Sequence, residues 1–161
     1  MKPEKNILVL CAHNSARSQM AEAFLRKHGG SQFVVYSAGL YPTEIHLYTR
    51  QVMAEVGLPL EGQHAKPVRD FLAKLPVHHL VIVCERTERE CPKLFLGAMR
   101  RHFWPFPDPA AIEGEPERQL EAFREVRDGI ERRILEWLRN PDAAADGVSE
   151  AGRVDGPVKR P

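Results

Sequence analysis

The chain has 161 residues, enough for one domain with a hydrophobic core and too few for two ordinary domains. Its 23 Lys and Arg residues nearly balance 22 Asp and Glu residues, and no basic stripe typical of nucleic-acid binders is present. The N-terminal apolar stretch is too short for a signal peptide or a membrane span, and three cysteines do not make a disulfide framework. We therefore expect a cytoplasmic monomer that binds neither nucleic acid nor membranes.

Apolar and amphipathic segments alternate along the chain, which predicts an α/β fold. Four apolar segments predict strands, namely residues 7–10, 33–37, 80–84 and 102–106. Apolar residues at helical spacing predict longer helices over 19–25, 45–56 and 116–139, and a shorter helix that begins with proline over 67–75. Such alternation is typical of a doubly wound parallel sheet with helices on both faces, in which ligands bind beyond the carboxyl ends of the strands.

The periodic pattern ends near residue 140. We expect residues 1–140 to form a single catalytic domain, and residues 141–161, which are rich in Ala, Gly, Asp and Pro, to form a disordered tail. The chain lacks a Walker-type glycine loop, a His-Glu-x-x-His motif and a Cys-x-x-Cys pair. The sequence therefore predicts neither nucleotide hydrolysis nor a bound metal.

The most informative segment lies between the first predicted strand and the first predicted helix. It is Cys11-Ala12-His13-Asn14-Ser15-Ala16-Arg17-Ser18. Unpaired amide groups of such a loop, together with the helix N-terminus, form a cradle for an anion. Arg17 can bind that anion bidentately, although it could also be a solvated residue at the start of the helix. Cys11, close to a helix N-terminus and a cation, is predicted to have a lowered pKa and to act as a nucleophile rather than as a core residue.

The other residues of this loop allow two interpretations. Asn14, Ser15 and Ser18 have short polar side chains that can fix the loop and hydrogen-bond a thiolate. Capping of the helix would explain Ser15 or Ser18 equally well. His13 either lines the site or lies on the surface, and the remaining histidines form no cluster with metal-ligand spacing.

Two further cysteines follow the third predicted strand. Cys84 ends that strand, so it should lie at the same edge of the sheet as Cys11, although a buried structural thiol would also fit. Cys91 follows the polar segment 85–90; if that segment were helical, the seven residues would span about 10.5 Å. A disulfide requires Cα atoms roughly 4.4–6.8 Å apart, so a Cys84–Cys91 bond requires a bent or rearranging loop over 85–90.

Asp108 follows the fourth predicted strand, in the segment Trp104-Pro105-Phe106-Pro107-Asp108-Pro109-Ala110. One interpretation is a turn or helix-capping residue. The other is a proton donor at the site, whose pKa is raised by the neighbouring Trp104 and Phe106. The residues themselves favour neither interpretation.

Together these residues resemble the low-molecular-weight protein tyrosine phosphatases, whose signature is Cys-x5-Arg-Ser after the first strand, here Cys11 to Ser18. Three further features make the chain similar to the thioredoxin-coupled arsenate reductase branch of that superfamily. They are the Ser37-Ala38-Gly39 turn, Cys84 with Cys91-Pro92, and Asp108-Pro109-Ala110. The resemblance covers roughly residues 5–140.

The resemblance implies a reaction sequence for the three cysteines. Cys11 attacks arsenate that is held by the loop and Arg17, while Asp108 protonates the departing oxygen. Cys84 then attacks Cys11 and releases arsenite. Finally Cys91 attacks Cys84, giving a disulfide that thioredoxin reduces with electrons from NADPH through thioredoxin reductase. No bound cofactor is implied.

The resemblance also bears on the support of the loop. Asn14 and Ser37, with Ser18 from the loop itself, are implied to hold it in shape. Some members of the branch bind potassium beside the loop through an oxygen-rich segment, and Glu22 and Ser37 would belong to such a site. Here the corresponding residues 64–67 are His-Ala-Lys-Pro, which have lost oxygen ligands and gained a cation, so we expect no potassium site.

Two other functions remain open. A phosphatase acting on phosphotyrosine or another aryl phosphate would use Cys11 and Asp108 but would need neither of the other cysteines. Tyrosine phosphatases of this fold usually have tyrosines after the acid, whereas Pro109-Ala110-Ala111-Ile112 follow Asp108 here. A non-enzymatic, redox-responsive module that binds oxyanions would keep the loop and not need Asp108. Arsenate reduction with weak phosphatase side activity is the prediction.

Overall fold

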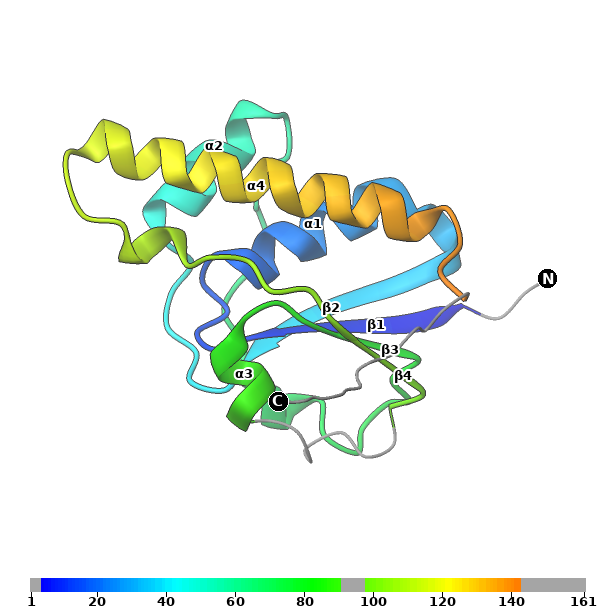
Figure 1. The fold of residues 1–161 in the computed structure, drawn as a ribbon. Helices are drawn as coiled ribbons and strands as arrows, with labels where there is room; N and C mark the ends of the chain where they lie inside the picture. Colours follow the sequence, from blue (N-terminus) through cyan, green and yellow to red (C-terminus); the bar gives the residue numbers. More distant parts are fainter. Residues whose placement is uncertain (1–3, 91–97, 143–161) are drawn as a thin grey trace, which may run out of the picture.

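A four-stranded parallel sheet forms the centre of the computed structural model, which describes residues 4–90 and 98–142 (Figure 1). The strands are β1 (Lys5–Cys11), β2 (Phe33–Gly39), β3 (His79–Ile82) and β4 (Arg100–Phe103), in the order β2-β1-β3-β4. The predicted doubly wound parallel sheet is therefore confirmed. β1 is central and almost fully buried, so the loop after it begins in the middle of the carboxyl edge.

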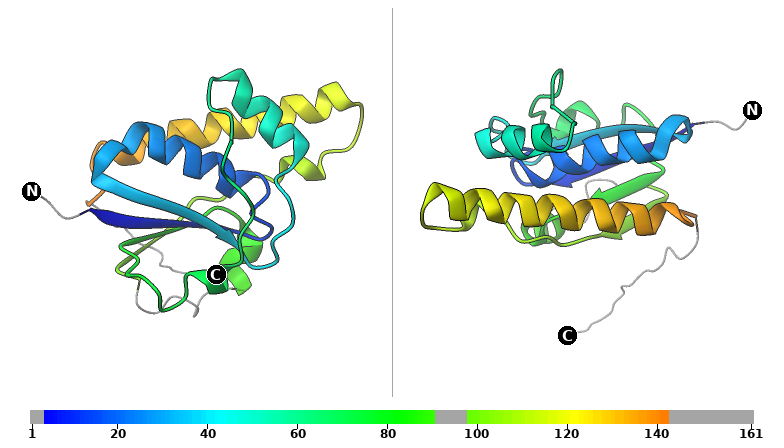
Figure 2. Two further views of the ribbon diagram at one scale, coloured as in Figure 1. Left: turned by 180° about the vertical axis from the view of Figure 1, so that it is seen from behind. Right: turned by 90° about the horizontal axis from the view of Figure 1, so that it is seen from above.

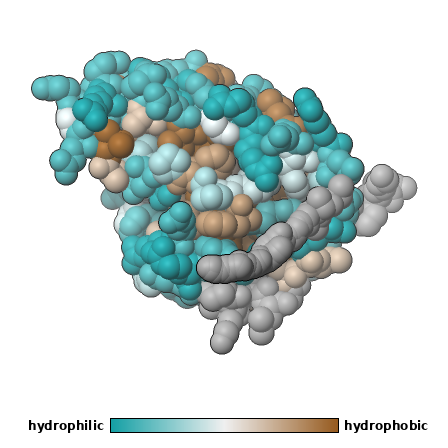
Figure 3. Space-filling view, in the orientation of Figure 1, coloured by the Kyte–Doolittle hydropathy of each residue, from teal (hydrophilic) through white to brown (hydrophobic). Residues whose placement is uncertain are grey.

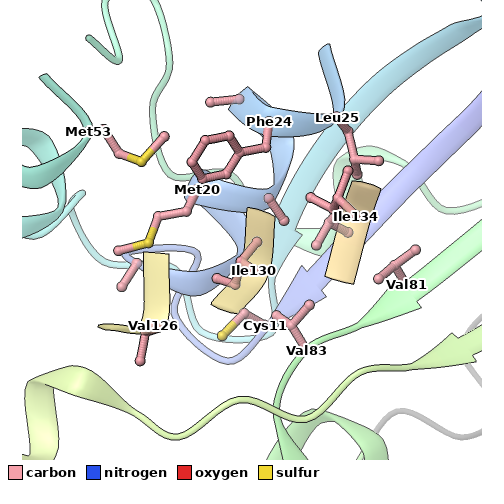
Figure 4. Close-up of a cluster of buried hydrophobic side chains, with 14 of the residues drawn as sticks. Cys11, Met20, Phe24, Leu25, Met53, Val81, Val83, Val126, Ile130 and Ile134 are labelled. Atoms are coloured by element: carbon pink, nitrogen blue, oxygen red, sulfur yellow. The ribbon is translucent and has the colours of Figure 1, made fainter. Parts of the chain in front are cut away.

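One face of the sheet is covered by the three longer helices (Figures 1 and 2). These are α1 (Arg17–Gly29), α2 (Leu47–Glu55) and α4 (Pro116–Leu138). The core lies between β1, β3, α1 and α4, where Val81, Met20 and Ile134 have no exposed surface. Figure 4 shows Cys11 at the edge of this core, together with Val83. Packing of this core therefore fixes the position of the loop that begins at Cys11.

On the opposite face of the sheet, the predicted shorter helix over 67–75 does not form. In place of a helix over 67–75, the chain forms a single 3-10 turn over Val68–Asp70, whose Val68 packs with Phe71 against this face. Two local features explain the difference. Pro67 is extended and lies in a bridge with Gly39, and Ala73 has a left-handed φ of 59°, which interrupts any helix.

The molecular surface agrees with the composition of the chain. In the view of Figure 3, hydrophilic side chains cover most of the surface and hydrophobic ones form smaller groups between them. No helix within residues 4–90 and 98–142 is long and apolar enough to cross a bilayer.

Candidate active site

The loop after β1 is held from outside by the segment that follows β2. Leu40 and Tyr41 donate their amides to the carbonyls of Cys11 and Ala12, at 3.3 and 2.8 Å, and His46 donates to the carbonyl of Ser15 at 3.0 Å. In a trans peptide the N–H points away from the C=O. Because the loop carbonyls are bound on the outside, the loop amides face inward, as an anion cradle requires.

Asn14 fixes the shape of this loop. It is fully buried and has a left-handed φ of 52°, a conformation that asparagine tolerates better than most residues. Its Nδ2 donates to Ser18 Oγ at 2.7 Å and to Ser37 Oγ at 3.0 Å, and its Oδ1 accepts from the Lys66 amide at 2.9 Å. The three predicted supporting residues thus lie in one hydrogen-bond network, which Lys66 joins.

Close approach of β2 to the loop requires a glycine. A Cβ on Gly39 would lie 2.9 Å from both the carbonyl oxygen of Ala12 and the amide nitrogen of Asn14. Real Cβ atoms do not approach backbone atoms so closely, so any side chain here would displace the loop. Gly39 is therefore part of the site, although the sequence marked it only as the end of a turn.

The residues around Glu22 do not fit a bound potassium ion. Ser37 Oγ donates to Glu22 Oε1 at 2.5 Å, and the carboxylate, which is only 2% exposed, forms ion pairs with Arg26 at 2.6 Å and Lys66 at 3.9 Å. Two side-chain cations already balance the charge that a potassium ion would neutralise. Among the described residues, no three His, Cys, Asp or Glu side chains are placed to hold a metal ion.

Arg17 begins α1 and points into the cleft in front of the loop. Its NH1 donates to the carbonyl of Phe106 at 2.9 Å, which ties the loop to the segment after β4. Its Nε is buried and has no hydrogen-bond partner within residues 4–90 and 98–142. A buried guanidinium N–H without a partner is costly, and an oxyanion in the loop would accept it.

Cys84 lines the cleft, and Cys11 belongs to the same buried cluster beneath it. Cys11 is 3% exposed and Cys84 is 2% exposed, and each thiol shifts the pKa of the other. The hydrogen bond from Cys11, followed by those from Thr87, lowers the pKa of Cys84 to about 5 against the effect of burial. The same bond, with burial, raises the pKa of Cys11 well above its usual value, although Arg17 acts in the opposite direction.

The predicted lowering of the Cys11 pKa is therefore wrong. The prediction was based on the helix N-terminus and Arg17, which favour a thiolate on Cys11. The thiol of Cys84 competes with Cys11 for the negative charge. The opposite pKa shifts of the two thiols favour the negative charge of the pair on Cys84 over Cys11. The pair is placed for disulfide formation once Cys11 is bonded to a better leaving group.

The segment after Cys84 is a helix and not the loop that the sequence suggested. α3 spans Glu85–Glu90. At its start, the Glu88 amide donates a hydrogen bond to the carbonyl of Cys84, at 3.1 Å. Arg86 lies 4.7 Å from the centre of the Tyr41 ring and pairs with Glu90 at 3.1 Å, which stabilises this short helix. Cys91 lies outside the described residues.

Asp108 lies on the opposite wall of the cleft and is exposed. Its Oδ1 accepts from the Ala110 amide at 3.0 Å, so it caps the 3-10 turn over Pro109–Ala111. Of the two aromatic neighbours considered, Phe106 lines the cleft with Asp108, whereas Trp104 is buried in the core with its ring 5.6 Å from that of Trp137. Asp108 therefore combines both interpretations, as a capping residue that also faces the site.

The cleft has a volume of about 590 Å³ and reaches Cys84 at the end of β3. Its walls come from the loop, α3 and the segment after β4, and they are lined by Ala12, His13, Arg17, Cys84, Glu85, Arg86, Arg89, Pro105, Phe106, Pro107 and Asp108. His13 is exposed at the rim, with Nδ1 3.0 Å from the Tyr41 carbonyl. The other lining residues include three arginines, so the cleft suits an anion.

Comparison with known proteins agrees with this arrangement. Residues 6–146 match the model of the low molecular weight phosphotyrosine protein phosphatase family. The chain belongs to this family. It is 36% identical to an arsenate reductase of Halalkalibacterium halodurans over 81% of this chain and 93% of the relative, and 34% identical to one of Bacillus subtilis over 83% and 94%.

Solved structures of family members support the same conclusion. An arsenate reductase in its phosphate-binding state aligns with a TM-score of 0.69 and 28% identity, over 84% of this chain and 97% of that chain. A thioredoxin-dependent arsenate reductase of Corynebacterium glutamicum aligns with a TM-score of 0.60 and 25% identity, over 86% of this chain and 62% of that chain. The resemblance drawn from the cysteines and the Asp-Pro-Ala segment is thus confirmed.

Proposed function

We propose that this protein reduces arsenate to arsenite through Cys11, Cys84 and Cys91, and that thioredoxin regenerates the thiols. The observation that carries the proposal is the presence of two buried thiols, Cys11 and Cys84, that interact with each other beside the anion loop. A phosphatase has no use for a second thiol at this position. The arsenate reductases among the relatives agree with this choice of substrate.

In the first step Cys11 Sγ attacks arsenic. The loop amides and Arg17 hold the oxyanion, and the Cys11 proton, with Asp108 assisting at the departing oxygen, leaves as part of one water molecule. Cys11 thiol and HAsO4²⁻ thereby give a Cys11–S–AsO3²⁻ adduct and water. Because Cys11 begins as a thiol, this exchange needs no other proton.

In the second step the Cys84 thiolate attacks Cys11 Sγ. The sulfur–arsenic bond breaks and its electron pair stays on arsenic, which becomes arsenite and takes up protons from water. The two thiols are oxidised to a Cys11–Cys84 disulfide while As(V) is reduced to As(III). The two thiols already interact in the resting protein, so the attacking sulfur starts near its target.

In the third step Cys91 attacks Cys84 Sγ and expels the Cys11 thiolate. With α3 helical, Cys84 and Cys91 would be separated by about 10.5 Å, well beyond the roughly 4.4–6.8 Å of a disulfide, so α3 must open for this step. The new disulfide is then reduced by the dithiol of thioredoxin, itself reduced by NADPH through thioredoxin reductase. Such a relay needs a compartment that keeps thiols reduced, and we therefore assign the protein to the cytoplasm.

The test is arsenate-dependent oxidation of NADPH with thioredoxin and thioredoxin reductase. The native protein should turn over repeatedly, whereas Cys91→Ser should release one arsenite per chain and stop with a Cys11–Cys84 disulfide that mass spectrometry detects. Sustained turnover by Cys91→Ser would overturn the assignment of the third step. Absence of arsenate-dependent turnover by the native protein would overturn the function.

A weak phosphatase activity is the second candidate, because the family model is that of phosphotyrosine phosphatases and Arg17 and Asp108 line one cleft beside the loop that begins at Cys11. The variant Cys84→Ser separates the two activities. It should abolish arsenate reduction but retain hydrolysis of an aryl phosphate, since water and not a thiol ends that reaction. Hydrolysis by the native protein far above its arsenate turnover would reverse the order of the two functions.

A further inference from the structure

Thr87 contacts the sulfur of Cys84 at two points. Its Oγ1 lies 2.9 Å from Cys84 Sγ and its backbone nitrogen donates to the same sulfur at 3.4 Å. Thr87 has no exposed surface, so its hydroxyl has no water to bind. It stands three residues after Cys84, within the polar segment 85–90.

A buried thiolate depends on such donors. Cys84 is 2% exposed, and a buried charge is costly unless hydrogen bonds or opposite charges compensate for lost water. Within the described residues, the groups that stabilise it are the Cys11 thiol, the hydroxyl and amide of Thr87, and the positive charge of Arg17. Two of the three hydrogen bonds therefore come from Thr87.

We propose that Thr87 is a positioning residue of the relay, whose hydroxyl and amide hold the Cys84 sulfur as a thiolate directed at Cys11. This proposal deepens the proposed function, because it concerns the second step. Thr87 also orients the sulfur. The side chain of Cys84 can rotate about one bond, and two donors on one residue of α3 restrict that rotation while α3 is helical.

The proposal predicts that loss of the Thr87 hydroxyl has opposite effects on the reactivity of Cys84 at acidic and at alkaline pH. The hydroxyl hydrogen bond stabilises the thiolate, so its loss should raise the pKa of Cys84 by about one unit. A less stabilised thiolate is more nucleophilic, with a Brønsted coefficient of about 0.4–0.5. Loss of the hydroxyl should therefore slow Cys84 about threefold at acidic pH, where less thiolate exists, and accelerate it about threefold at alkaline pH.

Other ionisable groups near Cys84 contribute to its titration and stay the same in the variants. They are Cys11 at the end of β1, His13 in the loop, Arg17 at the start of α1, three residues of α3 (Glu85, Arg86 and Arg89) and Asp108 after β4. Comparison of single Thr87 variants under the same conditions removes their contribution.

The experiment compares Thr87→Val, which has nearly the same shape without a hydroxyl, with Thr87→Ser, which restores the hydroxyl. Both are made with Cys91→Ser, so that the reaction ends at the Cys11–Cys84 disulfide. The first measurement is labelling of Cys84 with iodoacetamide across the pH range, quantified by peptide mass spectrometry without arsenate. The second is the rate of Cys11–Cys84 disulfide formation after a single addition of arsenate.

We expect the Thr87→Val profiles to cross that of the parent protein in both measurements, and the Thr87→Ser profiles to coincide with it. Thr43→Val is the matched control, because the Thr43 side chain is exposed and, within residues 4–90 and 98–142, its hydroxyl hydrogen-bonds the carbonyl of Glu44 alone, at 3.5 Å. It should not change either profile. A structural defect would shift the Thr87→Val rates in one direction at all pH values, which would overturn the proposal, as would an unchanged profile. Failure of arsenate reduction in the native protein would instead overturn the function and leave the labelling result intact.

Discussion

Replacement of Asn14 tests whether one buried amide maintains the anion loop. Asn14→Ala removes two donated hydrogen bonds and one accepted one, and it leaves the Lys66 amide without its partner. A buried polar group left unpaired costs about 1–3 kcal/mol, and a left-handed alanine adds about 1–2 kcal/mol. The sum is about 2–5 kcal/mol, a large part of the roughly 5–15 kcal/mol by which a domain of this kind is stable.

Asn14→Gly separates the two contributions. It loses the same hydrogen bonds but adopts a φ of 52° without strain, so it should be about 0.5–1 kcal/mol more stable than Asn14→Ala after its greater unfolded-state entropy is included. Urea unfolding, followed by the fluorescence of the buried Trp104 and Trp137, measures both variants. A cost below about 1 kcal/mol for Asn14→Ala, or a glycine variant less stable than the alanine one, would refute the reasoning.

Three further predictions follow from the site and the core. Burial lowers the pKa of His79 to about 4 and that of His102 to about 3, so both side chains are neutral in the folded protein and take up protons on unfolding. The free energy of unfolding should therefore fall as the pH drops from about 6.5 toward 4, and less steeply in His102→Gln. Urea unfolding at each pH measures this dependence. Arg17→Lys should weaken phosphate binding at least tenfold in calorimetry, because lysine cannot bind an oxyanion bidentately, and equal affinity would contradict that role. Gly39→Ala should cost about 1–3 kcal/mol in urea unfolding and weaken phosphate binding, since its Cβ would displace the loop, whereas a neutral effect would show that the loop can yield.

The parallel sheet could be predicted from the sequence because buried parallel strands are continuously apolar. The runs at 7–10 and 80–84 have this character. The long helix α4 could be predicted for another reason, namely its apolar residues at helical spacing. Residues 67–75 could not be assigned in the same way. Their start with a proline resembles a helix, but the bridge between Pro67 and Gly39 is a long-range contact that local pattern does not contain.

The site shows the same division between local and long-range information. The loop from Cys11 to Ser18 has a local motif, so its chemistry could be predicted. The role of Lys66 depends on Asn14 and Glu22, which lie far from it in the sequence, and that of Gly39 on its approach to the loop backbone. These residues carry no motif of their own, and only the packed structure brings them together.

The charge distribution between the two sulfurs explains how the loop can bind a dianion. A thiolate on Cys11 would lie against the bound oxyanion and repel it in a site with little water. Here the proton remains on Cys11 and the charge lies on Cys84, which Thr87 and Arg17 stabilise. In the proposed relay Cys11 would deliver its proton as it attacks, and Cys84 would react as a thiolate in the following step.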